Sequence, residues 1–407
     1  MKGLRKAGVT AARGFLAAAS AAGIKPGSRR GKHGDVALVV AERPAVAAGV
    51  FTTNRIQAAP VLWSRAIVRS RRSVHAVLLN SGNANACTGQ AGRAATRTSA
   101  RALAQLLGCA PGEVLVASTG VIGVPLPIAR LVGALPAAVA RLGARRADGT
   151  AAATAIMTTD THAKEHAVRV RAGGRTYTVG GLAKGAGMIH PEMATLLAVI
   201  TTDAPLSPPQ AARLLAAAAR RSFNAITVDG DTSTNDCVFL LASGAAGGRV
   251  AAHSPAERAL GRALTAVAWA LARAVAADGE GAEKLLIVHV AGARTEPAAR
   301  RIARAVAGSP LVKAAVHGGD PNWGRVLAAA GRAGVALDPA ALDLVIGGHQ
   351  VARAGVADPA GERGAAEHLA GREIEMLLVV GRGPGAAVAM GCDLTARYVA
   401  INAHYRS

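Results

Sequence analysis

Residues 180–202 read Gly-Gly-Leu-Ala-Lys-Gly-Ala-Gly-Met-Ile-His-Pro-Glu-Met-Ala-Thr-Leu-Leu-Ala-Val-Ile-Thr-Thr, a glycine-dense stretch followed directly by an apolar one. Glycine allows backbone angles and close approaches that other residues do not, so residues 180–187 predict a loop that a ligand can approach closely. Residues 193–202 hold enough Leu, Val, Ile and Thr to predict a central strand. The stretch therefore predicts a strained loop that leads straight into the core of a sheet.

The rest of the chain predicts an alternation of strands and helices on both sides of this stretch. Short apolar runs bounded by Gly, Pro or Asn predict strands at residues 35–40, 74–79, 113–117, 165–170, 176–179, 283–291, 342–346, 373–380 and 386–392. Longer Ala-rich runs predict helices at residues 91–107, 128–142, 207–220, 255–276 and 297–307. This alternation is typical of an α/β protein built from layered sheets and helices, although composition alone places no domain boundary.

The chain is strongly basic, with 47 Lys and Arg against 25 Asp and Glu and a formal net charge of +22. Such a charge raises the local concentration of anionic ligands and can favour nucleic acid. The arginines, however, are scattered singly through Ala-rich stretches, and only 2% of the residues are aromatic side chains able to stack on bases. We therefore expect no nucleic-acid partner and attribute the charge to a solvated, arginine-rich surface.

The cysteines are Cys87, Cys109, Cys237 and Cys392, which lie far apart and form no CxxC pair. This spacing argues against a zinc site or a disulfide framework and is typical of a reducing cytoplasm.

No apolar run predicts a membrane span of about 20 residues, because Arg273 interrupts the longest candidate, residues 264–277. Residues 14–23 follow three basic residues and superficially resemble a secretion signal. They run directly into Gly23-Ile-Lys-Pro and a basic stretch, which favours a structural segment of the mature protein. We expect a cytoplasmic protein with no membrane partner.

Thr195 follows a small residue at the junction of the predicted loop and strand, and two interpretations fit it. Its hydroxyl can attack the preceding carbonyl carbon and so act as a nucleophile. Alternatively it merely begins a strand, where threonine is common, and spacing alone favours this interpretation. A phosphate-binding loop is not indicated, because residues 181–184 lack the order GxxxxGK followed by Ser or Thr.

Other segments rich in Thr, Asn and Gly interrupt the apolar chain, as active-site segments on a rigid scaffold often do. They are Gly49-Val-Phe-Thr-Thr-Asn-Arg, Asn80-Ser-Gly-Asn-Ala-Asn-Ala-Cys-Thr-Gly, Ala155-Ile-Met-Thr-Thr-Asp-Thr, Ser222-Phe-Asn-Ala-Ile-Thr-Val-Asp-Gly-Asp-Thr-Ser-Thr-Asn-Asp, Asp278-Gly-Glu-Gly-Ala, Asp320-Pro-Asn-Trp-Gly-Arg and Tyr398-Val-Ala-Ile-Asn. Together with residues 184–195, and in this order, they closely resemble the ornithine acetyltransferase (glutamate N-acetyltransferase) family. The likeness extends from near the N-terminus to the last residue.

The resemblance implies a chain that cleaves itself between Ala194 and Thr195. The products would be an α chain of residues 1–194 and a β chain of residues 195–407, which stay together and pair as an α2β2 heterotetramer. Thr195 would be the nucleophile, because the cut frees its α-amine, whose pKa of about 7.7–8.0 leaves a useful neutral fraction as the adjacent base. The implied fold is an α/β, layered α-β-β-α sandwich with a smaller C-terminal lobe.

The implied reaction moves an acetyl group from N2-acetyl-L-ornithine to L-glutamate through an O-acetyl-Thr195 intermediate, with ping-pong kinetics. Thr119 and Gly120 match the family's oxyanion hole, although Ser118-Thr-Gly alone is an ordinary turn after a strand. The family's substrate-binding positions fall on Thr158 or its neighbour Thr159, Lys184, Thr195, Glu280, Asn402 and Ser407.

Charge explains two of these positions. Lys184 can pair with the carboxylate of an amino-acid substrate, and Glu280 can hold an ammonium group, which ornithine and glutamate both carry. Without the resemblance, Lys184 is a solvated loop lysine and Glu280 a turn residue.

Two histidines and three aspartates suggest further chemistry that we do not adopt. His190 and His317 are candidate general bases, but the resemblance assigns that role to the threonine amine. Asp229, Asp231 and Asp236 lie in a Thr/Ser/Asn-rich segment that favours a tight polar turn over a metal site. We expect no metal and no bound cofactor, with acetyl-CoA as a possible acetyl donor.

Three alternatives stay open at this point. A bifunctional variant also uses acetyl-CoA to acetylate glutamate. An N-terminal-nucleophile hydrolase lets water replace glutamate as the acceptor. A basic binding module keeps the enzyme scaffold without its chemistry.

Overall fold

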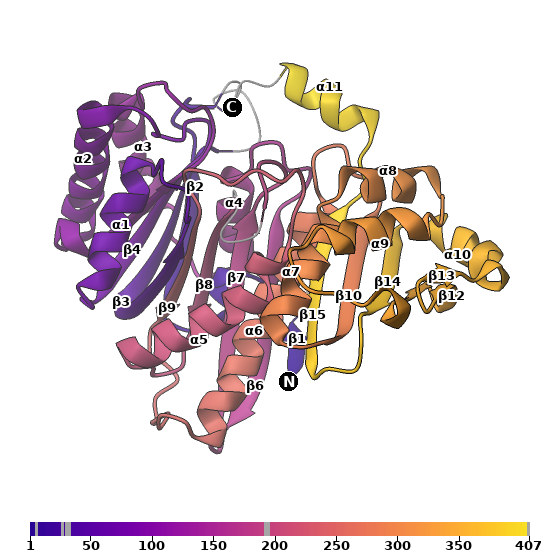
Figure 1. Ribbon diagram of the computed structural model, residues 1–407. Helices are drawn as coiled ribbons and strands as arrows, with labels where there is room; N and C mark the ends of the chain where they lie inside the picture. The colour runs from indigo at the N-terminus through magenta and orange to yellow at the C-terminus, as the bar shows by residue number, and fades with distance from the viewer. Residues whose placement is uncertain (5–6, 26–27, 29–33, 191–195, 405–407) are drawn as a thin grey trace.

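The computed structural model describes residues 1–4, 7–25, 28, 34–190 and 196–404. Two sheets with their covering helices lie side by side, the larger from the first part of the chain and the smaller from the last part (Figure 1).

Within the described residues the larger sheet has 9 strands, in the order β1-β6-β7-β8-β9-β3-β4-β5 with β2 paired to β3. The strands are β1 (Lys2–Leu4), β2 (Phe15–Ser20), β3 (Val36–Phe51), β4 (Val74–Asn80), β5 (Val114–Ser118), β6 (Lys164–Ala172), β7 (Arg175–Lys184), β8 (Leu197–Thr202) and β9 (Cys237–Ala242).

The long strand β3 lets this sheet fold over into two layers. Its first half pairs with β2 and β4, and its second half, from Val46 to Phe51, pairs with β9. A register shift between Val40 and Ala45 separates the two halves, and such irregularities bend a strand and increase its twist. One layer therefore holds β2, β4 and β5, and the other holds β1, β6, β7, β8 and β9.

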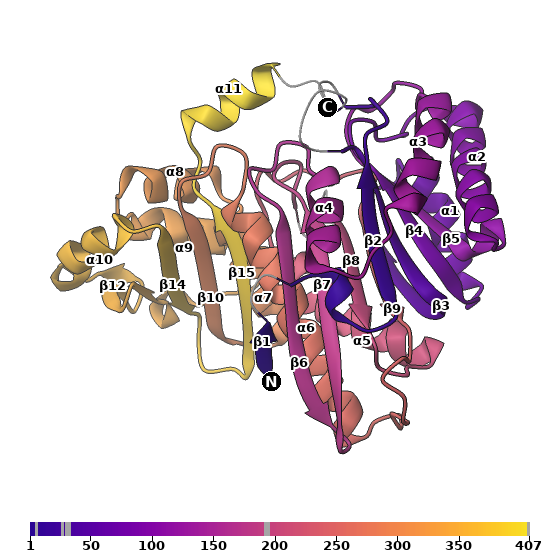
Figure 2. The same cartoon turned by 180° about the vertical axis from the view of Figure 1, so that it is seen from behind.

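Helices cover the outer face of each layer (Figures 1 and 2). They are α1 (Ala59–Arg69), α2 (Gly89–Leu107), α3 (Ile128–Ala140), α5 (Pro208–Arg221) and α6 (Pro255–Ala277). Helix α4 (Arg146–Ala155) instead packs against β2 and β3 and contributes to the core between the layers. Buried residues of α2 and α3 share a core with the β4 and β5 layer, while α5 and α6 share one with β7, β8 and β9. A third core lies between the layers and includes Ala152 and Ala153 of α4. The order of layers is helix, sheet, sheet, helix, which confirms the predicted α-β-β-α sandwich.

Side chains on β3 alternate between two of these cores, as the period of two in a strand requires. Ala37, Val39 and Ala41 belong to the core between the layers. Leu38 and Val40, on the opposite face, belong to the core beneath α2 and α3.

The last part of the chain forms the predicted smaller lobe. Its sheet has the strand order β13-β12-β11-β14-β10-β15. The elements are β10 (Leu285–Ala293), α7 (Glu296–Ala307), α8 (Pro310–Gly318), α9 (Trp323–Gly331), β11 (Asp343–Ile346), β12 (His349–Arg353), β13 (Val356–Ala357), α10 (Glu362–Leu369), β14 (Glu373–Val379), β15 (Gly385–Cys392) and α11 (Ala396–His404).

One predicted element is wrong: residues 180–187 are not a loop throughout, because β7 continues to Lys184. The glycines serve close packing instead of a turn. A Cβ at Gly180 would lie 2.1 Å from the carbonyl oxygen of Gly8, and one at Gly181 would lie 3.0 Å from Leu271 of α6. Only the part that follows Lys184 leaves the sheet.

Two segments with a membrane-like composition belong to the layered core. Among the described residues, α6 is the one helix that is long and apolar enough to cross a bilayer by length and composition. The sequence analysis did not predict such a helix here, because Arg273 interrupts the apolar run of residues 264–277. Its buried face packs against the sheet layer that contains β6 and β7. Residues 15–20, the core of the signal-like stretch, form the buried strand β2, as the structural interpretation predicted.

Candidate active site

Six residues named from the sequence line one pocket, which lies where β5 and β7 of the larger sheet end. They are Thr119, Gly120, Thr158, Lys184, Glu280 and Asn402. Thr159 also lines it, so both residues considered for that substrate-binding position are present. A wider groove of about 1070 Å³ between α5, α6 and β15 contains none of them. The smaller pocket is therefore the candidate active site.

Lys184 is the last residue of β7, and its side chain is only 3% exposed. Its Nζ donates hydrogen bonds to Thr158 Oγ1 at 2.8 Å and to Thr119 Oγ1 at 3.4 Å. Burial lowers the pKa of Lys184 from its ordinary value, while the nearby carboxylate of Asp160 opposes that shift. Lys184 thus supplies a buried positive group between the predicted oxyanion residue and a predicted substrate residue.

Thr119 and Gly120 follow β5, and the structure restricts which of their atoms can donate to a ligand. The backbone N–H of Thr119 already donates to the carbonyl oxygen of Asn80 at 3.0 Å. Gly120 has φ 128°, and a Cβ there would lie 2.3 Å from the backbone carbon of Gly82. The donors available to an oxyanion are therefore the Thr119 hydroxyl and the Gly120 N–H.

Glu280 lies in the short connection after α6 and brings negative charge to the pocket. Its N–H donates to the carbonyl oxygen of Ala186 at 2.8 Å, and its Oε2 accepts a hydrogen bond from Asn402 Nδ2 at 2.8 Å. The carboxylate packs so tightly on Gly187 that a Cβ there would lie 2.4 Å from Cδ of Glu280. Asn402 arrives on α11, which extends back from the smaller lobe toward the larger one (Figure 1).

The sequence interpretation did not single out Asn235 and treated Asp236 only as part of a turn, yet both belong to the surroundings of the pocket. Asn235 lines the pocket, and its Nδ2 donates to the carbonyl oxygens of Ala84 and Ser118 at 2.6 and 2.8 Å. Asp236 is fully buried, and its Oδ1 accepts the N–H of Leu196 at 2.9 Å. Burial raises the pKa of Asp236 well above its ordinary value.

Ala194 and Thr195, which form the predicted cleavage bond, lie outside the described residues. The terminal Ser407 lies outside them as well. Their roles stay predictions. Leu196, the residue after Thr195, is described and is held by Asp236 directly before β8 begins at Leu197.

Asp229, named above in a predicted polar turn, holds a turn in a different segment of the chain, at Met188 and Ile189. Its two carboxylate oxygens accept hydrogen bonds from the N–H groups of Met188 at 2.5 Å and Ile189 at 2.8 Å. Met188 has φ 55°, so this carboxylate holds a left-handed backbone turn beside the pocket. His190 Nδ1 lies 3.2 Å from Thr227 Oγ1, a local structural contact.

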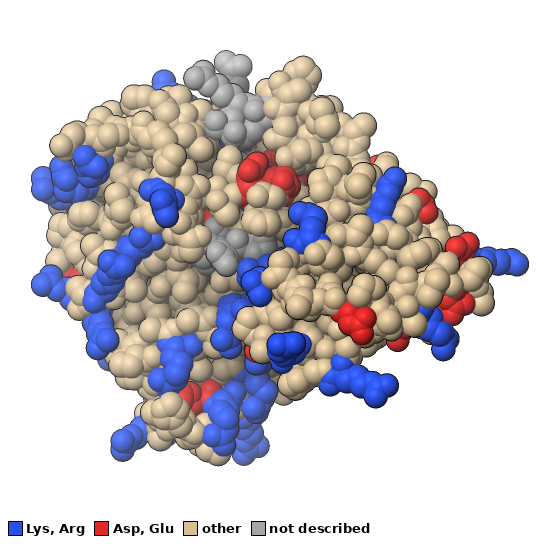
Figure 3. All heavy atoms as spheres, viewed as in Figure 1, with Lys and Arg blue, Asp and Glu red and all other residues tan. Residues whose placement is uncertain are grey.

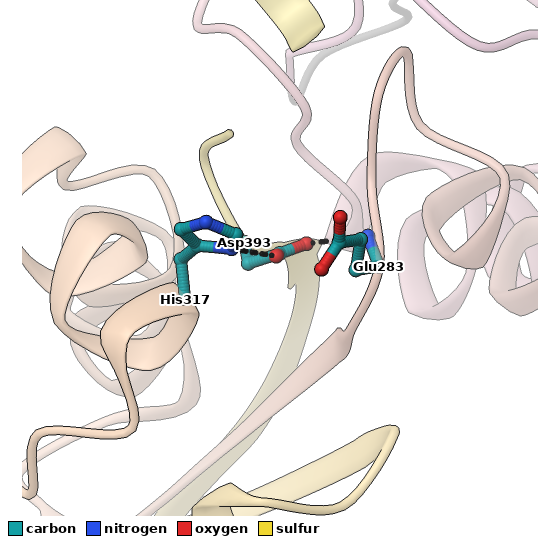
Figure 4. A group of neighbouring side chains, drawn as sticks. All are labelled: Glu283, His317 and Asp393. Carbon is teal, nitrogen blue, oxygen red and sulfur yellow. Dashed lines mark hydrogen bonds and ion pairs between the residues drawn. The ribbon is translucent and has the colours of Figure 1, made fainter. Parts of the chain in front are cut away.

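His317 belongs to a separate group with Glu283 and Asp393, whose ligand atoms lie within 4.8 Å of one another (Figure 4). Asp393 Oδ2 lies 3.0 Å from His317 Nδ1, and Asp393 Oδ1 accepts the N–H groups of Glu283 and Lys284 at 2.9 Å. Asp393 Oδ2 thus joins α8 to the end of β15, and Asp393 Oδ1 joins that end to the segment before β10. None of the three residues lines the pocket.

Basic side chains are spread over the face seen in Figure 3. This distribution agrees with the scattered arginines of the sequence.

Comparison with known proteins places these features in a family. The model described as the ArgJ family matches residues 16–407. The chain is 50% identical over 401 residues to the arginine biosynthesis bifunctional protein ArgJ of Gloeobacter violaceus, covering 98% of this chain and 97% of that protein. It is also 50% identical to the protein of the same name from Symbiobacterium thermophilum, covering 98% of each.

Solved structures of similar sequence are known as well. The arginine biosynthesis bifunctional protein of Bacillus halodurans is 37% identical, with a TM-score of 0.49, over 50% of this chain and 97% of that one. Ornithine acetyltransferase from Mycobacterium tuberculosis, solved with ornithine, is 43% identical, with a TM-score of 0.43, over 48% of this chain and 98% of that one.

Proposed function

Because the chain belongs to the ArgJ family of arginine-biosynthesis acyltransferases, we propose that it transfers the acetyl group of N2-acetyl-L-ornithine to L-glutamate. One observation carries the proposal: a single pocket combines a buried lysine, a pair of oxyanion donors and a glutamate held by an asparagine. The positive charge of Lys184 and the negative charge of Glu280 suit substrates that carry both a carboxylate and an ammonium group.

The proposal includes self-cleavage between Ala194 and Thr195. A threonine hydroxyl is a weak nucleophile at neutral pH and needs an adjacent base. Cleavage supplies that base as the α-amine of Thr195, whose ordinary pKa of about 7.7–8.0 leaves part of it neutral near pH 7–8.

The sheet order supports fragments that stay together after such a cut. In the larger sheet β8 and β9 lie between β7 on one side and β3 on the other. The α chain of residues 1–194 contains β7 and β3, whereas β8 and β9 belong to the β chain of residues 195–407. Both fragments then share one continuous sheet, and two such pairs form the proposed α2β2 heterotetramer.

In the first half-reaction Thr195 Oγ attacks the acetyl carbonyl carbon of N2-acetylornithine, and the Thr195 amine accepts the hydroxyl proton. The Thr119 hydroxyl and the Gly120 N–H donate hydrogen bonds to the resulting oxyanion. The C–N bond then breaks, the amine returns its proton to the leaving nitrogen, and ornithine departs. In the second half-reaction the neutral amino group of glutamate attacks the O-acetyl ester and releases the Thr195 hydroxyl.

The test of this function combines a gel with a transfer assay. We expect denaturing electrophoresis to show two fragments, with N-terminal sequencing of one reading Thr-Leu-Leu-Ala-Val. Mass spectrometry after incubation with N2-acetylornithine alone should find one acetyl group on Thr195, which added glutamate then removes. A single uncut chain that transfers acetyl normally would contradict the mechanism. Acetate formed without acetylglutamate would indicate a hydrolase instead.

A second activity is favoured by the name of the relatives, which are called bifunctional. We propose that acetyl-CoA also serves as a donor for glutamate. Purified protein incubated with acetyl-CoA and glutamate should form acetylglutamate, and the Thr195→Ala variant provides the matched blank. We place both activities in the cytoplasm, a proposal consistent with four free cysteines.

A further inference from the structure

A buried group of ions lies behind the pocket and is not part of its lining. At its centre is Lys164, the first residue of β6, with a side chain that is 0% exposed. Its Nζ donates to Asp160 Oδ1 at 2.6 Å, to Asp278 Oδ2 at 2.5 Å and to the carbonyl oxygen of His162 at 3.5 Å. Three acceptors match the three protons of the ammonium group, so Lys164 is fixed in one orientation.

On one side this group holds the segment that presents Lys184. Asp160 Oδ1 accepts the N–H of Gly185 at 2.7 Å, and Asp160 Oδ2 accepts the N–H of Thr158 at 3.0 Å. Asp160 Oδ2 also lies 3.8 Å from Lys184 Nζ. Asp160 therefore fixes the backbone of Thr158, which accepts a hydrogen bond from Lys184, and the backbone of Gly185, which follows Lys184 in the chain.

On the other side the group holds the segment that presents Glu280. Asp278 caps the C-terminal end of α6, two residues before Glu280, and its side chain is 4% exposed. Its Oδ2 accepts the N–H of Thr161 at 3.0 Å, and its Oδ1 accepts the Thr161 hydroxyl. Lys164 thus bridges the two segments that carry the opposite charges of the pocket.

Stability alone does not account for such a bridge. Replacing a buried ion pair with well-packed apolar residues is often neutral or stabilising, because removing ions from water is costly. What an ion pair adds over an apolar contact is direction, since each charged hydrogen bond fixes the position of its partner. In this protein the fixed positions are those of Lys184 and Glu280.

We propose that Asp160, Lys164 and Asp278 act as a spacer that sets the separation between Lys184 and Glu280, and thereby the length of the diamino acid that the pocket accepts. The inference rests on the proposed function and adds that, when ornithine is bound, Lys184 holds its carboxylate and Glu280 holds the ammonium group at the far end of its side chain. The three residues are positioning residues, because they act through Lys184 and Glu280.

Selectivity among free diamino acids of different length tests the spacer without requiring turnover. The ligands are 2,4-diaminobutyrate, ornithine and lysine, each one methylene longer than the last, and calorimetry measures the Kd of each. Because one methylene in a fitted pocket is worth about 10–200-fold, we expect the native protein to bind ornithine at least about tenfold more tightly than its two neighbours. In Lys164→Met we expect the three Kd values to converge.

The matched control is Lys313→Met. Lys313 is another buried lysine, 3% exposed, which donates to the carbonyl oxygen of Val228 and does not line the pocket. Its loss measures the general cost of removing a buried ammonium group, and we expect the preference for ornithine to persist. Thermal unfolding and circular dichroism of both variants establish that they fold.

A second variant, with a smaller change to the buried ion group, is used if Lys164→Met does not fold. Asp278→Asn keeps the size of the side chain and one acceptor oxygen but weakens its bond with Lys164, and it should reduce the preference for ornithine to a smaller degree. A folded Lys164→Met or Asp278→Asn protein that keeps the full preference would overturn the spacer. Failure of the native protein to transfer acetyl to glutamate would contradict the proposed function instead, since the Kd comparison does not depend on turnover.

Discussion

The side-chain amide of Asn235 donates a hydrogen bond to the carbonyl oxygen of Ser118 at 2.8 Å, and so ties the residue before Thr119 to the start of β9. The same nitrogen donates to the carbonyl oxygen of Ala84 at 2.6 Å. Two backbone carbonyls around the oxyanion residues thus depend on one buried side chain. The position of the Thr119 hydroxyl and the Gly120 N–H follows from this clamp.

Asn235→Ala should therefore lower kcat more than it raises KM. A displacement of about 1 Å in a catalytic group can cost about 100-fold in rate, and each buried carbonyl left without a donor costs about 1–3 kcal/mol of stability. Steady-state kinetics and thermal unfolding measure the two effects. Asn322→Ala is the control, because Asn322 caps α9 in the smaller lobe and does not line the pocket. This variant should be less stable but keep its kcat. Unchanged kcat in Asn235→Ala would show that the clamp is not needed.

Thr119 permits a direct test of the oxyanion donors. Thr119→Val keeps the shape of the side chain but removes its hydroxyl, and loss of one such donor costs about 10²–10³ in kcat. Thr119→Ser keeps the hydroxyl and should retain most of the rate. If the two variants are equally slow, the hydroxyl is not the group that carries the rate.

Much of the fold followed from the sequence, and the failures have local causes. The helix predicted at 255–276 is α6, and the strand at 386–392 is β15, because each begins beside a Pro or Gly and is mostly apolar. The strand predicted at 35–40 is only the start of β3. Glu42-Arg43-Pro44 interrupts the apolar pattern, and the strand continues through it because the register shift there accommodates a proline.

The candidate site was less accessible to sequence reasoning. Lys184 and Glu280 were named through a family resemblance, since a lysine or glutamate beside glycines is usually solvated. Lys164 gave no signal at all, because a single lysine at the start of a strand has the same pattern whether it is exposed or buried. Only the fold shows that two carboxylates, Asp160 and Asp278, converge on it.

Gly120 should not tolerate a side chain. Its φ of 128° is unfavourable for other residues, and an added Cβ would lie 2.3 Å from the backbone of Gly82, which is unable to move like a flexible side chain. Gly120→Ala should lower the thermal unfolding temperature and abolish transfer. Gly112→Ala is the matched control, because a Cβ at Gly112 meets no atom within 4 Å and its φ is not positive. Equal stability of the two variants would contradict the geometry.

Asp160 and Asp236 are both buried, yet their carboxyl groups should affect stability in opposite ways as pH changes. Burial alone would raise the pKa of Asp160, but the ammonium groups of Lys184 and Lys164 hold that pKa well below its ordinary value. For Asp236 burial dominates and raises the pKa well above its ordinary value. The ionised form therefore stabilises the fold at Asp160 and destabilises it at Asp236.

The variants Asp160→Asn and Asp236→Asn should separate these two effects. Both are compared in a Thr195→Ala background, so that every chain stays uncut. Asp160→Asn removes the carboxylate paired with Lys184 and one of the two paired with Lys164, which keeps Asp278. Breaking buried pairs in this way costs about 3–5 kcal/mol, and this deficit should stay constant from pH 8 to pH 5 and shrink only below about pH 4, the ordinary pKa of aspartate. Asp236→Asn keeps an acceptor for the N–H of Leu196 and removes an unfavourable charge. Its free energy of unfolding relative to the parent should therefore rise as pH increases, because only the parent has an ionisable group at this position. Denaturant titration across this range measures both curves, and parallel curves for the two variants would mean that Asp236 is ionised and paired like Asp160.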